Sequence, residues 1–162
     1  MYNILKLMEN EWQPYIIIQL NGDIKEIMKY KIEKDLYEHT LLLNKKQNEL
    51  VPINCGFRCV RSTIINRSYY STYLYVKKYL INNGHDIHNI SYYLKNKKKV
   101  ITEHQQVIDE LEEINGELSI KLLNLKQLRH KADYHPSKHI STKDVNNAIS
   151  LMNDIMQNLK NN

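Results

Sequence analysis

The chain is poor in the residues that interrupt helices and in those that cross-link small proteins. Its 162 residues include four glycines, three prolines and two cysteines. So few turn-forming residues leave long uninterrupted runs, which favour helices over a sheet with many turns. Cys55 and Cys59 are too few for a disulfide framework and lack the second pair that a zinc site needs. We therefore expect two reduced, half-buried thiols.

Long apolar runs are also absent. No stretch approaches the length of a transmembrane helix, and the first residues lack the basic, apolar and small-residue order of a signal peptide. We therefore expect a cytoplasmic protein without a membrane partner, and a chain of this length is expected to build one ordinary core. The net charge of +5 and the lysines at 95 and 97–99 permit a polyanionic partner.

The first 46 residues allow two interpretations. Residues 15–20 are typical of a short strand or a buried segment, and Asn21-Gly22 is a turn signal that would close a hairpin. Beyond that turn the apolar residues recur three and four apart, which predicts a helix over about 24–46. The competing interpretation places a second strand over 23–32 and starts the helix near Glu33.

Four further helices are predicted downstream. The first of them follows a loop over 44–56, in which Asn54 is a candidate cap, and ends at Asn82-Asn83-Gly84. It is apolar over more than half of its circumference, which indicates a central place in a bundle. Residues 85–101 are expected to form a connection with a helical turn around 90–94.

The last three predicted helices have recognisable ends. Thr102 and Gln105 have the spacing of a capping box, and Asn115-Gly116 stops the helix that starts there. The next helix covers 117–134, and Ser141 or Thr142 caps the final one. We therefore predict an all-α fold, with residues 1–22 as an N-terminal extension and residues 23–162 as a single helical bundle.

The segment 128–136 carries the residues best suited to chemistry. Leucines and Ala132 recur at helical spacing before it, so Arg129 and His130 lie near the end of an amphipathic helix whose apolar side is already occupied. Pro136 disfavours the α region for the preceding residue, so His135 begins a turn and its ring is free to swing back toward Arg129. In a continued helix, six residues would rotate by about 240° and separate the two side chains.

Arginine and histidine are the residue types that metal-free RNA cleavage requires. An acid or base must move protons at the ribose 2′-hydroxyl and at the leaving oxygen, and a permanent cation must balance the charge that grows on the phosphoryl oxygens. Histidine titrates near neutral pH, and arginine is always charged. The spacing of Arg129 and His135 is by itself a weak signal, because such pairs occur by chance in many helical proteins.

A second polar feature lies in the central helix at Arg67. An arginine on an apolar stripe needs a partner if it is buried, and Asp133 is a suitable carboxylate on the fourth helix. We favour a structural ion pair between Arg67 and Asp133 over direct contact of Arg67 with RNA. Tyr69, Tyr70 and Tyr134 are favoured as core rings with tethered hydroxyl groups over base-stacking platforms. Arg67, Asp133 and Tyr70 are thus assigned structural roles.

Two motifs together resemble a known family. Small bacterial members of the HEPN superfamily carry Arg-small-Tyr-Tyr and Arg-x-x-Ala-Asp-Tyr, which are similar to residues 67–70 and 129–134 of this chain. The resemblance covers about residues 57–159 and includes His104, which resembles the histidine that opens the family's third helix. It implies an antiparallel helical bundle that pairs as a homodimer.

The resemblance also implies an activity. Many members are metal-independent endoribonucleases marked by Arg, four to six residues and then His, and Arg129 and His135 fit that spacing. This implies RNA cleavage to a 2′,3′-cyclic phosphate without cofactor, in which Arg129 stabilises the phosphorane, His135 is the general acid or base and His130 assists. Two copies of the motif would face each other across the dimer, where Arg129 of one chain meets His135 of the other.

The implied biological role is the toxin of a toxin–antitoxin or phage-defence pair, with a nucleotidyltransferase-like antitoxin as partner. Some toxins of the family are silenced by modification of a tyrosine two residues after the motif histidine, and this chain has Ser137 there. The alternative, from another functional class, is a non-catalytic HEPN module that binds a nucleotide or a partner nucleotidyltransferase. In that case the 129–136 stretch is structural.

Other polar residues complete the set of candidates. The expected RNA contacts are Lys131, Tyr134, His139, Lys97 and Lys98. His139 either joins a phosphate pocket or sits in the turn, and the lysine run is favoured as a solvated loop over a path for the RNA backbone. His85, Asp86 and His88 have the residue types of a metal site, but such residues in a loop are more often solvated, so no metal is expected.

Overall fold

The chain divides into two compact units, residues 1–32 and 33–162. The computed structural model describes residues 3–4, 15–20, 23–29, 32–50, 56–87, 92–94 and 99–160. The first unit holds three strands, and the second holds the helices and a pair of short strands. The second unit therefore starts at Glu33, where the competing interpretation of the sequence starts the first helix.

The first unit is a small antiparallel sheet. It consists of β1 (Asn3–Ile4), β2 (Tyr15–Leu20) and β3 (Asp23–Lys29), in the order β1-β2-β3. Ile17 pairs with Ile27, and the register shifts between Ile18 and Gln19. The helix predicted over 24–46 was thus wrong in its first part, because a β-branched strand beside this segment supplies a ladder of hydrogen bonds that helical spacing alone does not reveal. The predicted Asn21-Gly22 turn lies outside the described residues.

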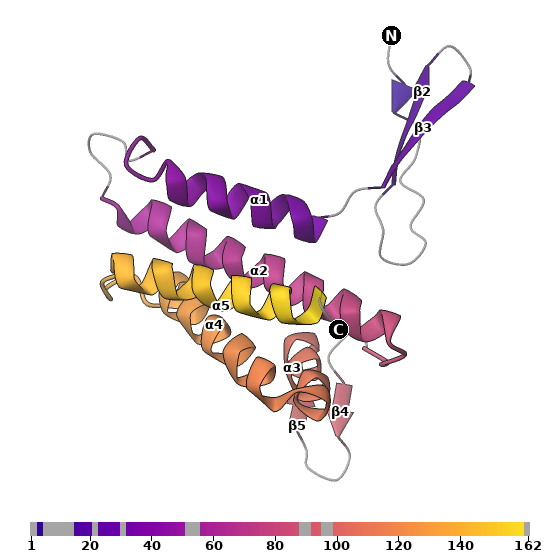
Figure 1. Ribbon diagram of the computed structural model, residues 1–162. Helices are drawn as coiled ribbons and strands as arrows, with labels where there is room; N and C mark the ends of the chain where they lie inside the picture. Colours follow the sequence, from indigo (N-terminus) through magenta and orange to yellow (C-terminus); the bar gives the residue numbers. More distant parts are fainter. Residues whose placement is uncertain are drawn as a thin grey trace. The chain divides into compact units, whose positions relative to one another are not determined.

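The second unit is a bundle of helices, as predicted. Its helices are α1 (Ile32–Lys45), α2 (Arg58–Asn82), α3 (Glu103–Ile114), α4 (Gly116–Tyr134) and α5 (Thr142–Lys160). In Figure 1, α2 lies between α1 and the pair formed by α4 and α5, and it packs against α3, α4 and α5. Neighbours in the chain, α1 with α2 and α4 with α5, run antiparallel to each other.

The core of the bundle is built around α2. Ile64, Ile65, Val76 and Leu80 of this helix are fully buried, and Tyr69 is almost so. The other helices add apolar side chains from their inner faces, among them Val107, Leu111, Leu122, Leu125, Val145, Met152 and Ile155. The central place predicted for this helix from its wide apolar surface is therefore confirmed.

Side-chain caps define where three of the helices start. The Thr102 hydroxyl accepts a hydrogen bond from the backbone N–H of Gln105 at 3.3 Å, and the Asn115 amide oxygen accepts one from Leu118 at 3.1 Å. Ser141 and Asp144 bond reciprocally at the start of α5. These caps satisfy N–H groups that have no partner within the helix, so local sequence sets the boundaries.

The structure tests the predicted end of α2 but not the cap that was predicted before its start. Gly84 adopts a positive φ of 86°, a conformation that glycine reaches at little cost, two residues after the last helical residue. The predicted stop at Asn82-Asn83-Gly84 is thus confirmed. At the other end Phe57 occupies the N-cap without a capping hydrogen bond, and the proposed cap Asn54 lies outside the described residues.

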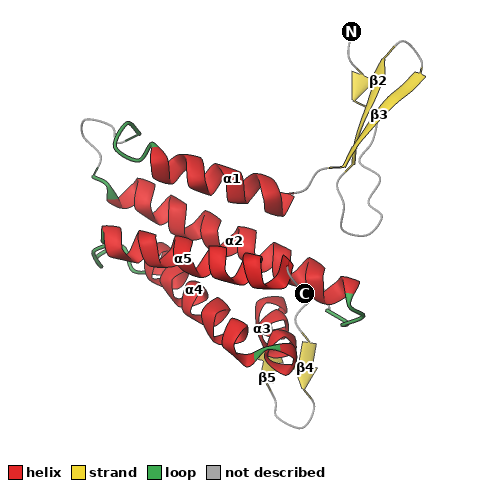
Figure 2. Cartoon of the chain, viewed as in Figure 1, coloured by secondary structure: helices red, strands yellow, loops and turns green. Residues whose placement is uncertain are grey.

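The connection between α2 and α3 contains a second strand pair. β4 (Tyr92–Leu94) and β5 (Lys99–Ile101) are antiparallel, with Tyr93 opposite Val100 (Figure 2). The helical turn predicted around 90–94 is therefore wrong for residues 92–94, because aromatic and β-branched residues on the two arms pair across the ladder. Residues 90 and 91 lie outside the described part.

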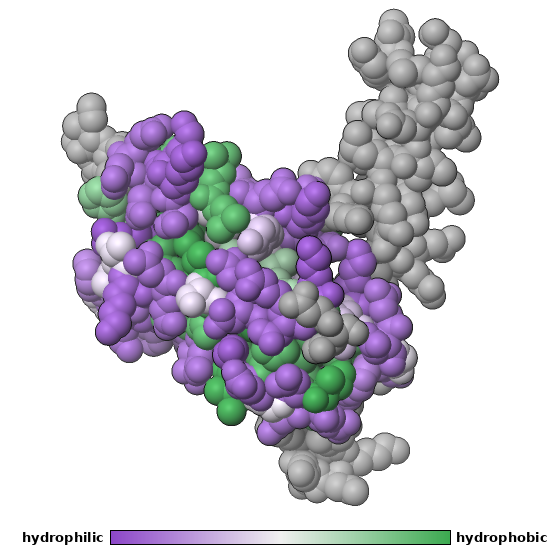
Figure 3. Space-filling view, viewed as in Figure 1, coloured by the Kyte–Doolittle hydropathy of each residue, from purple (hydrophilic) through white to green (hydrophobic). Residues whose placement is uncertain are grey.

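One face of the helical unit is mainly polar (Figure 3). On the face drawn in Figure 3, hydrophilic residues cover most of the helices, and apolar residues emerge in smaller patches among them. Within the described residues, no helix combines the length and the apolar character needed to cross a membrane.

We expect Asn115→Ala to lower the free energy of unfolding by about 1 kcal/mol, because it removes the N-cap of α4. Denaturant unfolding measures this change. Asn124→Ala is the matched control, since Asn124 is exposed in the interior of the same helix and alanine is a good helix former. An equal loss in both variants would contradict the capping role.

Candidate functional site

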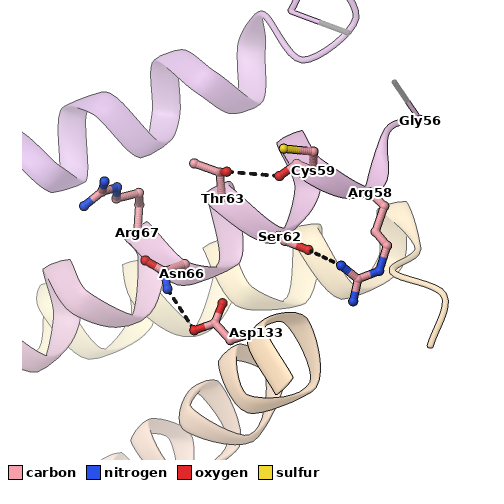
Figure 4. A pocket seen from close by; sticks show the side chains of 8 residues that line it. All are labelled: Gly56, Arg58, Cys59, Ser62, Thr63, Asn66, Arg67 and Asp133. Atoms are coloured by element: carbon pink, nitrogen blue, oxygen red, sulfur yellow. Dashed lines mark hydrogen bonds between the residues drawn. The ribbon is translucent and has the colours of Figure 1, made fainter. Parts of the chain in front are cut away.

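One polar stripe of α2 contacts the C-terminal end of α4. Arg58, Ser62, Asn66 and Tyr70 recur at every fourth position, so they lie on the same face of the helix. Figure 4 shows Asn66 directed at Asp133 of α4 and Arg58 directed at Ser62. This polar stripe of α2 thus contacts the segment 128–136, in which the sequence analysis found the candidate catalytic residues.

Arg58 fastens the turn that follows α4. Its Nη2 atom donates to the carbonyl oxygens of Ala132 at 3.2 Å and His135 at 2.9 Å, and its Nε donates to that of Lys138 at 3.3 Å. The last carbonyl groups of a helix have no partner within the helix, so these bonds satisfy groups that Pro136 prevents from continuing the ladder. Arg58 therefore sets the backbone position of His135.

Arg61 also holds the segment that follows α4. Its Nη1 donates to the carbonyl oxygen of Ile140 at 3.1 Å, and its guanidinium lies 4.9 Å from the centre of the Phe57 ring. The sequence analysis assigned no role to Arg58 or Arg61. A signal existed, because the first turn of α2 contains two arginines and no acidic residue, although the positive end of a helix favours acidic side chains.

Arg129 is held on several sides. Its Nε lies 2.7 Å from Asp133 Oδ2, as a close ion pair without the alignment of a hydrogen bond. Its Nη2 donates to the hydroxyl groups of Tyr70 at 3.2 Å and Tyr134 at 3.4 Å. The guanidinium also lies over both rings, 5.4 and 5.2 Å from their centres. The cation is therefore fixed in position and only partly exposed.

Arg129 stays charged in this setting. Burial acts to lower the pKa of its guanidinium, but Tyr70, Asp133 and Tyr134 act in the opposite direction, and the net effect raises the pKa. A permanent cation at the end of α4, as expected from the sequence, is thus consistent with its surroundings.

The predicted ion pair between Arg67 and Asp133 is wrong. Asp133 is paired with Arg129 and accepts a hydrogen bond from Asn66 at 3.0 Å, and no ion pair joins it to Arg67 in the part of the chain that the structure describes. Successive residues are about 100° apart around a helix, so Asn66 faces α4 and Arg67 is turned to the exposed side. Asp133 and Tyr70 keep structural roles, but with Arg129 as their partner.

The two candidate histidines of this segment pack against each other. The His130 ring lies 5.3 Å from the His135 ring in a T-shaped contact and 4.8 Å from the ring of Tyr134. His135 has left the helical conformation, with φ −122° and ψ 73°, as expected for the residue before Pro136. No hydrogen bond or ion pair joins Arg129 to His135 among the described residues, so within one chain they are linked through Tyr134 and His130.

The tyrosines differ in burial. Tyr69 is a core ring and Tyr70 is half-buried, which confirms that part of the prediction, but Tyr134 is 58% exposed. Tyr134 lies in the last turn of α4, where its hydroxyl group contacts Arg129 and much of its side chain remains exposed. The core position predicted for Tyr134 is therefore wrong.

The remaining predicted RNA contacts are Lys131, His139, Lys97 and Lys98. Lys131 forms an ion pair with Asp144 at 3.0 Å, so its charge already links α4 to the start of α5. His139 is exposed in the turn, and Lys97 and Lys98 lie outside the described residues. Of these predicted RNA contacts, Lys131 is therefore engaged in a structural ion pair.

The other polar predictions concern cysteine and metal chemistry. Cys59 is exposed, in contrast to the expected half-buried thiol, because it lies on the outer face of the first turn of α2; Cys55 is outside the described residues. His85 pairs with Glu110 at 2.7 Å, and His88 is not described. No group of three or more potential metal ligands of the His, Cys, Asp or Glu types occurs among the described residues.

A buried polar cluster lies behind Arg129. The Tyr69 hydroxyl and His104 Nδ1 are 2.8 Å apart, and the rings of His104 and Tyr73 are 4.2 Å apart. Burial, reinforced by the charge of Lys126, lowers the pKa of His104. The imidazole is therefore neutral near pH 7, and it shares a hydrogen bond with the Tyr69 hydroxyl group.

Replacement of Arg58 by alanine should weaken the end of α4. We expect a loss of roughly 1–3 kcal/mol in the free energy of unfolding, because the carbonyl groups of Ala132 and His135 lose a charged donor. Arg67→Ala, an exposed change on the same helix, should stay within about 0.5 kcal/mol of the wild type. If the two variants unfold alike in denaturant, Arg58 does not hold the turn.

The neutral state of His104 predicts a pH dependence. Since its folded pKa lies below the ordinary value of 6.5, the unfolded chain binds the proton more readily, and stability should fall as the pH drops below about 6.5. His104→Gln should make the free energy of unfolding less steep between about pH 7.5 and 5.5. His39→Gln, at an exposed position of α1, should leave the slope unchanged. A slope unaltered by His104→Gln would exclude the depressed pKa.

Comparison with known proteins agrees with the helical unit. No curated protein and no solved structure matches the chain. One protein-family model, described as the HEPN domain, matches residues 60–162. The match begins within α2 and includes all of α3, α4 and α5, the helices that build the core and the site around Arg129. This protein therefore belongs to the HEPN family.

Proposed function

We propose that this protein is a metal-independent endoribonuclease whose cleavage centre contains Arg129, His130 and His135. The observation that carries the proposal is that the anchored Arg129 cation directly precedes His130, whose ring packs against that of His135 at the end of α4. Membership of the HEPN family supports a role with RNA or nucleotides. These residue types supply both a charge stabiliser and groups that transfer protons near neutral pH.

The chemistry would be an internal transesterification. A histidine acting as base removes the proton of the ribose 2′-hydroxyl, the oxygen attacks the neighbouring phosphorus, and the 5′-oxygen leaves with a proton from an acid. The products are a 2′,3′-cyclic phosphate and a 5′-hydroxyl end. Arg129 would balance the charge that grows on the phosphoryl oxygens, His135 would act as the acid or base, and His130 would assist.

A homodimer would complete this centre. The base and the acid must act on opposite sides of the phosphorus, whereas the rings of His130 and His135 contact each other edge to face. A phosphoryl group does not fit between two rings in contact. We therefore propose that two copies of the α4 end face each other, so that Arg129 of one chain acts together with His135 of the other.

The biological part of the proposal is the role of a toxin in a toxin–antitoxin or phage-defence pair in the cytoplasm. A nucleotidyltransferase-like protein would be the cognate antitoxin. The exposed ring of Tyr134 and the exposed His139 beside the proposed centre are suited to contact an RNA strand.

A second candidate is a HEPN module that binds a nucleotide or a partner nucleotidyltransferase without catalysis. The specific observation in its favour is that Asp133 already balances the charge of Arg129. This ion pair stabilises the end of the helix, and it makes Arg129 less able to stabilise the negative charge of a transition state. The two candidates differ in whether removal of a histidine abolishes an activity.

The deciding experiment is cleavage of total RNA by the purified protein in the presence of EDTA. We expect Arg129→Ala and His135→Ala to lower the cleavage rate by about 100-fold or more, the range typical for loss of an acid–base group. The wild type should leave 2′,3′-cyclic phosphate ends.

His39→Ala is the matched control, since His39 is an exposed histidine of α1 that has no role in the proposed centre. It should cleave at nearly the wild-type rate, and thermal unfolding must show that all variants are folded. Cleavage that persists undiminished in His135→Ala, or a wild type that does not cleave once freed of any inhibitor, would rule out this centre and favour the binding module.

A further inference from the structure

An open pocket lies beside the first three turns of α2. It has a volume of about 580 Å³. Figure 4 shows Arg58 and Arg67 at opposite ends of the group of side chains that line it, with Asp133 of α4 between them. The lining residues are Gly56, Arg58, Cys59, Ser62, Thr63, Asn66, Arg67 and Asp133. Apart from Gly56, which precedes α2, and Asp133 of α4, they belong to two neighbouring stripes of α2, one facing α4 and one exposed.

The pocket carries uncompensated positive charge. Arg58 is bound by neutral carbonyl groups, and Arg67 is exposed; neither forms an ion pair with a carboxylate among the described residues. Asp133 is the single acidic residue of the lining that the structure describes, and Arg129 balances it at 2.7 Å. The N-terminal end of α2 adds a further positive potential. An anion is therefore the ligand that this surface favours.

The polar lining suits a phosphate group. A guanidinium binds phosphate oxygens with paired donors, and the hydroxyl-bearing side chains of Ser62 and Thr63 line the same pocket. Arg67 is suited to this role because its exposed side chain forms no hydrogen bond or ion pair among the described residues. An open pocket of this kind admits a chain that enters and leaves it.

We infer that this pocket is a subsite for the backbone phosphate of an RNA strand, with Arg67 as its principal contact. The inference rests on the proposed ribonuclease function and adds the path of the substrate. Asp133 lines the pocket and also pairs with Arg129, so the pocket adjoins the proposed cleavage centre directly. A strand bound there has a phosphate beside Arg67 and continues past the end of α4 toward the histidines.

The test is binding of a 2′-O-methyl RNA oligonucleotide, which lacks the attacking hydroxyl and is not cleaved. Affinity is measured by fluorescence anisotropy at several salt concentrations. We expect Arg67→Gln to weaken binding by about fivefold or more at low salt and to reduce the slope of log K against log salt by about 0.7, the value for one lost phosphate contact on a single strand. Arg67→Glu should weaken binding further.

Lys143→Gln is the matched control for charge. Lys143 is an exposed cation on α5 that does not line the pocket, so this variant should bind within about twofold of the wild type. Equal effects of Arg67→Gln and Lys143→Gln would overturn the inference, as would a wild type that does not bind the oligonucleotide. Displacement of the RNA by a nucleoside monophosphate at low concentration would assign the pocket to a free nucleotide and also overturn it.

A second measurement locates the bound strand. Cys59 is exposed and lines the pocket, so saturating 2′-O-methyl RNA should slow its alkylation by iodoacetamide, quantified by mass spectrometry of the peptide that contains it. The same protection should be reduced in Arg67→Glu. An alkylation rate of Cys59 that RNA does not change would overturn the location.

The outcomes also separate this inference from the proposed function. Binding that depends on Arg67 in a protein that does not cleave RNA supports the subsite and overturns the ribonuclease. Cleavage that depends on His135, together with binding that is indifferent to Arg67, supports the ribonuclease and overturns the subsite.

Discussion

The end of α4 keeps its place because α2 donates hydrogen bonds to it. Arg58 serves three carbonyl groups of the turn, and Asn66 serves the carboxylate of Asp133, which in turn holds Arg129. Pro136 has no N–H to donate to the carbonyl of Ala132, and Arg58 supplies that donor; the carbonyl of His135 also accepts from the N–H of Lys138. The position of His135, and with it the whole candidate centre, depends on these side chains of a distant helix.

The same arrangement gathers positive charge at one end of the bundle. Arg58 and Arg61 donate hydrogen bonds to neutral carbonyl groups, and these contacts do not cancel the charge of either guanidinium. Arg129 differs, because Asp133 lies against it. Like charges on one surface repel each other, which costs stability that an anionic ligand would restore. This contrast is the physical reason why we propose an RNA phosphate site along α2 and a cleavage centre at the end of α4.

Much of the fold was predictable from local sequence. Thr102, Asn115 and Ser141 act as the caps or boundaries that their positions indicate, and the wide apolar surface of residues 58–82 marked the central helix. The errors lie in residues 24–29 and 92–94, where the apolar spacing allows a helix but pairing with a second strand decides the structure. The partner of a strand is a different segment of the chain, so the spacing of apolar residues within one segment does not reveal it.

The candidate site, like the fold, was predictable from the sequence only where it depends on local structure. The sequence by itself determined the helices, their caps and the presence of Arg129, His130 and His135 around a helix end, because these depend on neighbours along the chain. Only the tertiary structure decided that Asn66 rather than Arg67 meets Asp133, that Arg58 holds the turn, and that Arg67 is left at an open pocket. Adjacent residues differ by about 100° around a helix, and only the packing of α2 against α4 fixes which of them faces the partner.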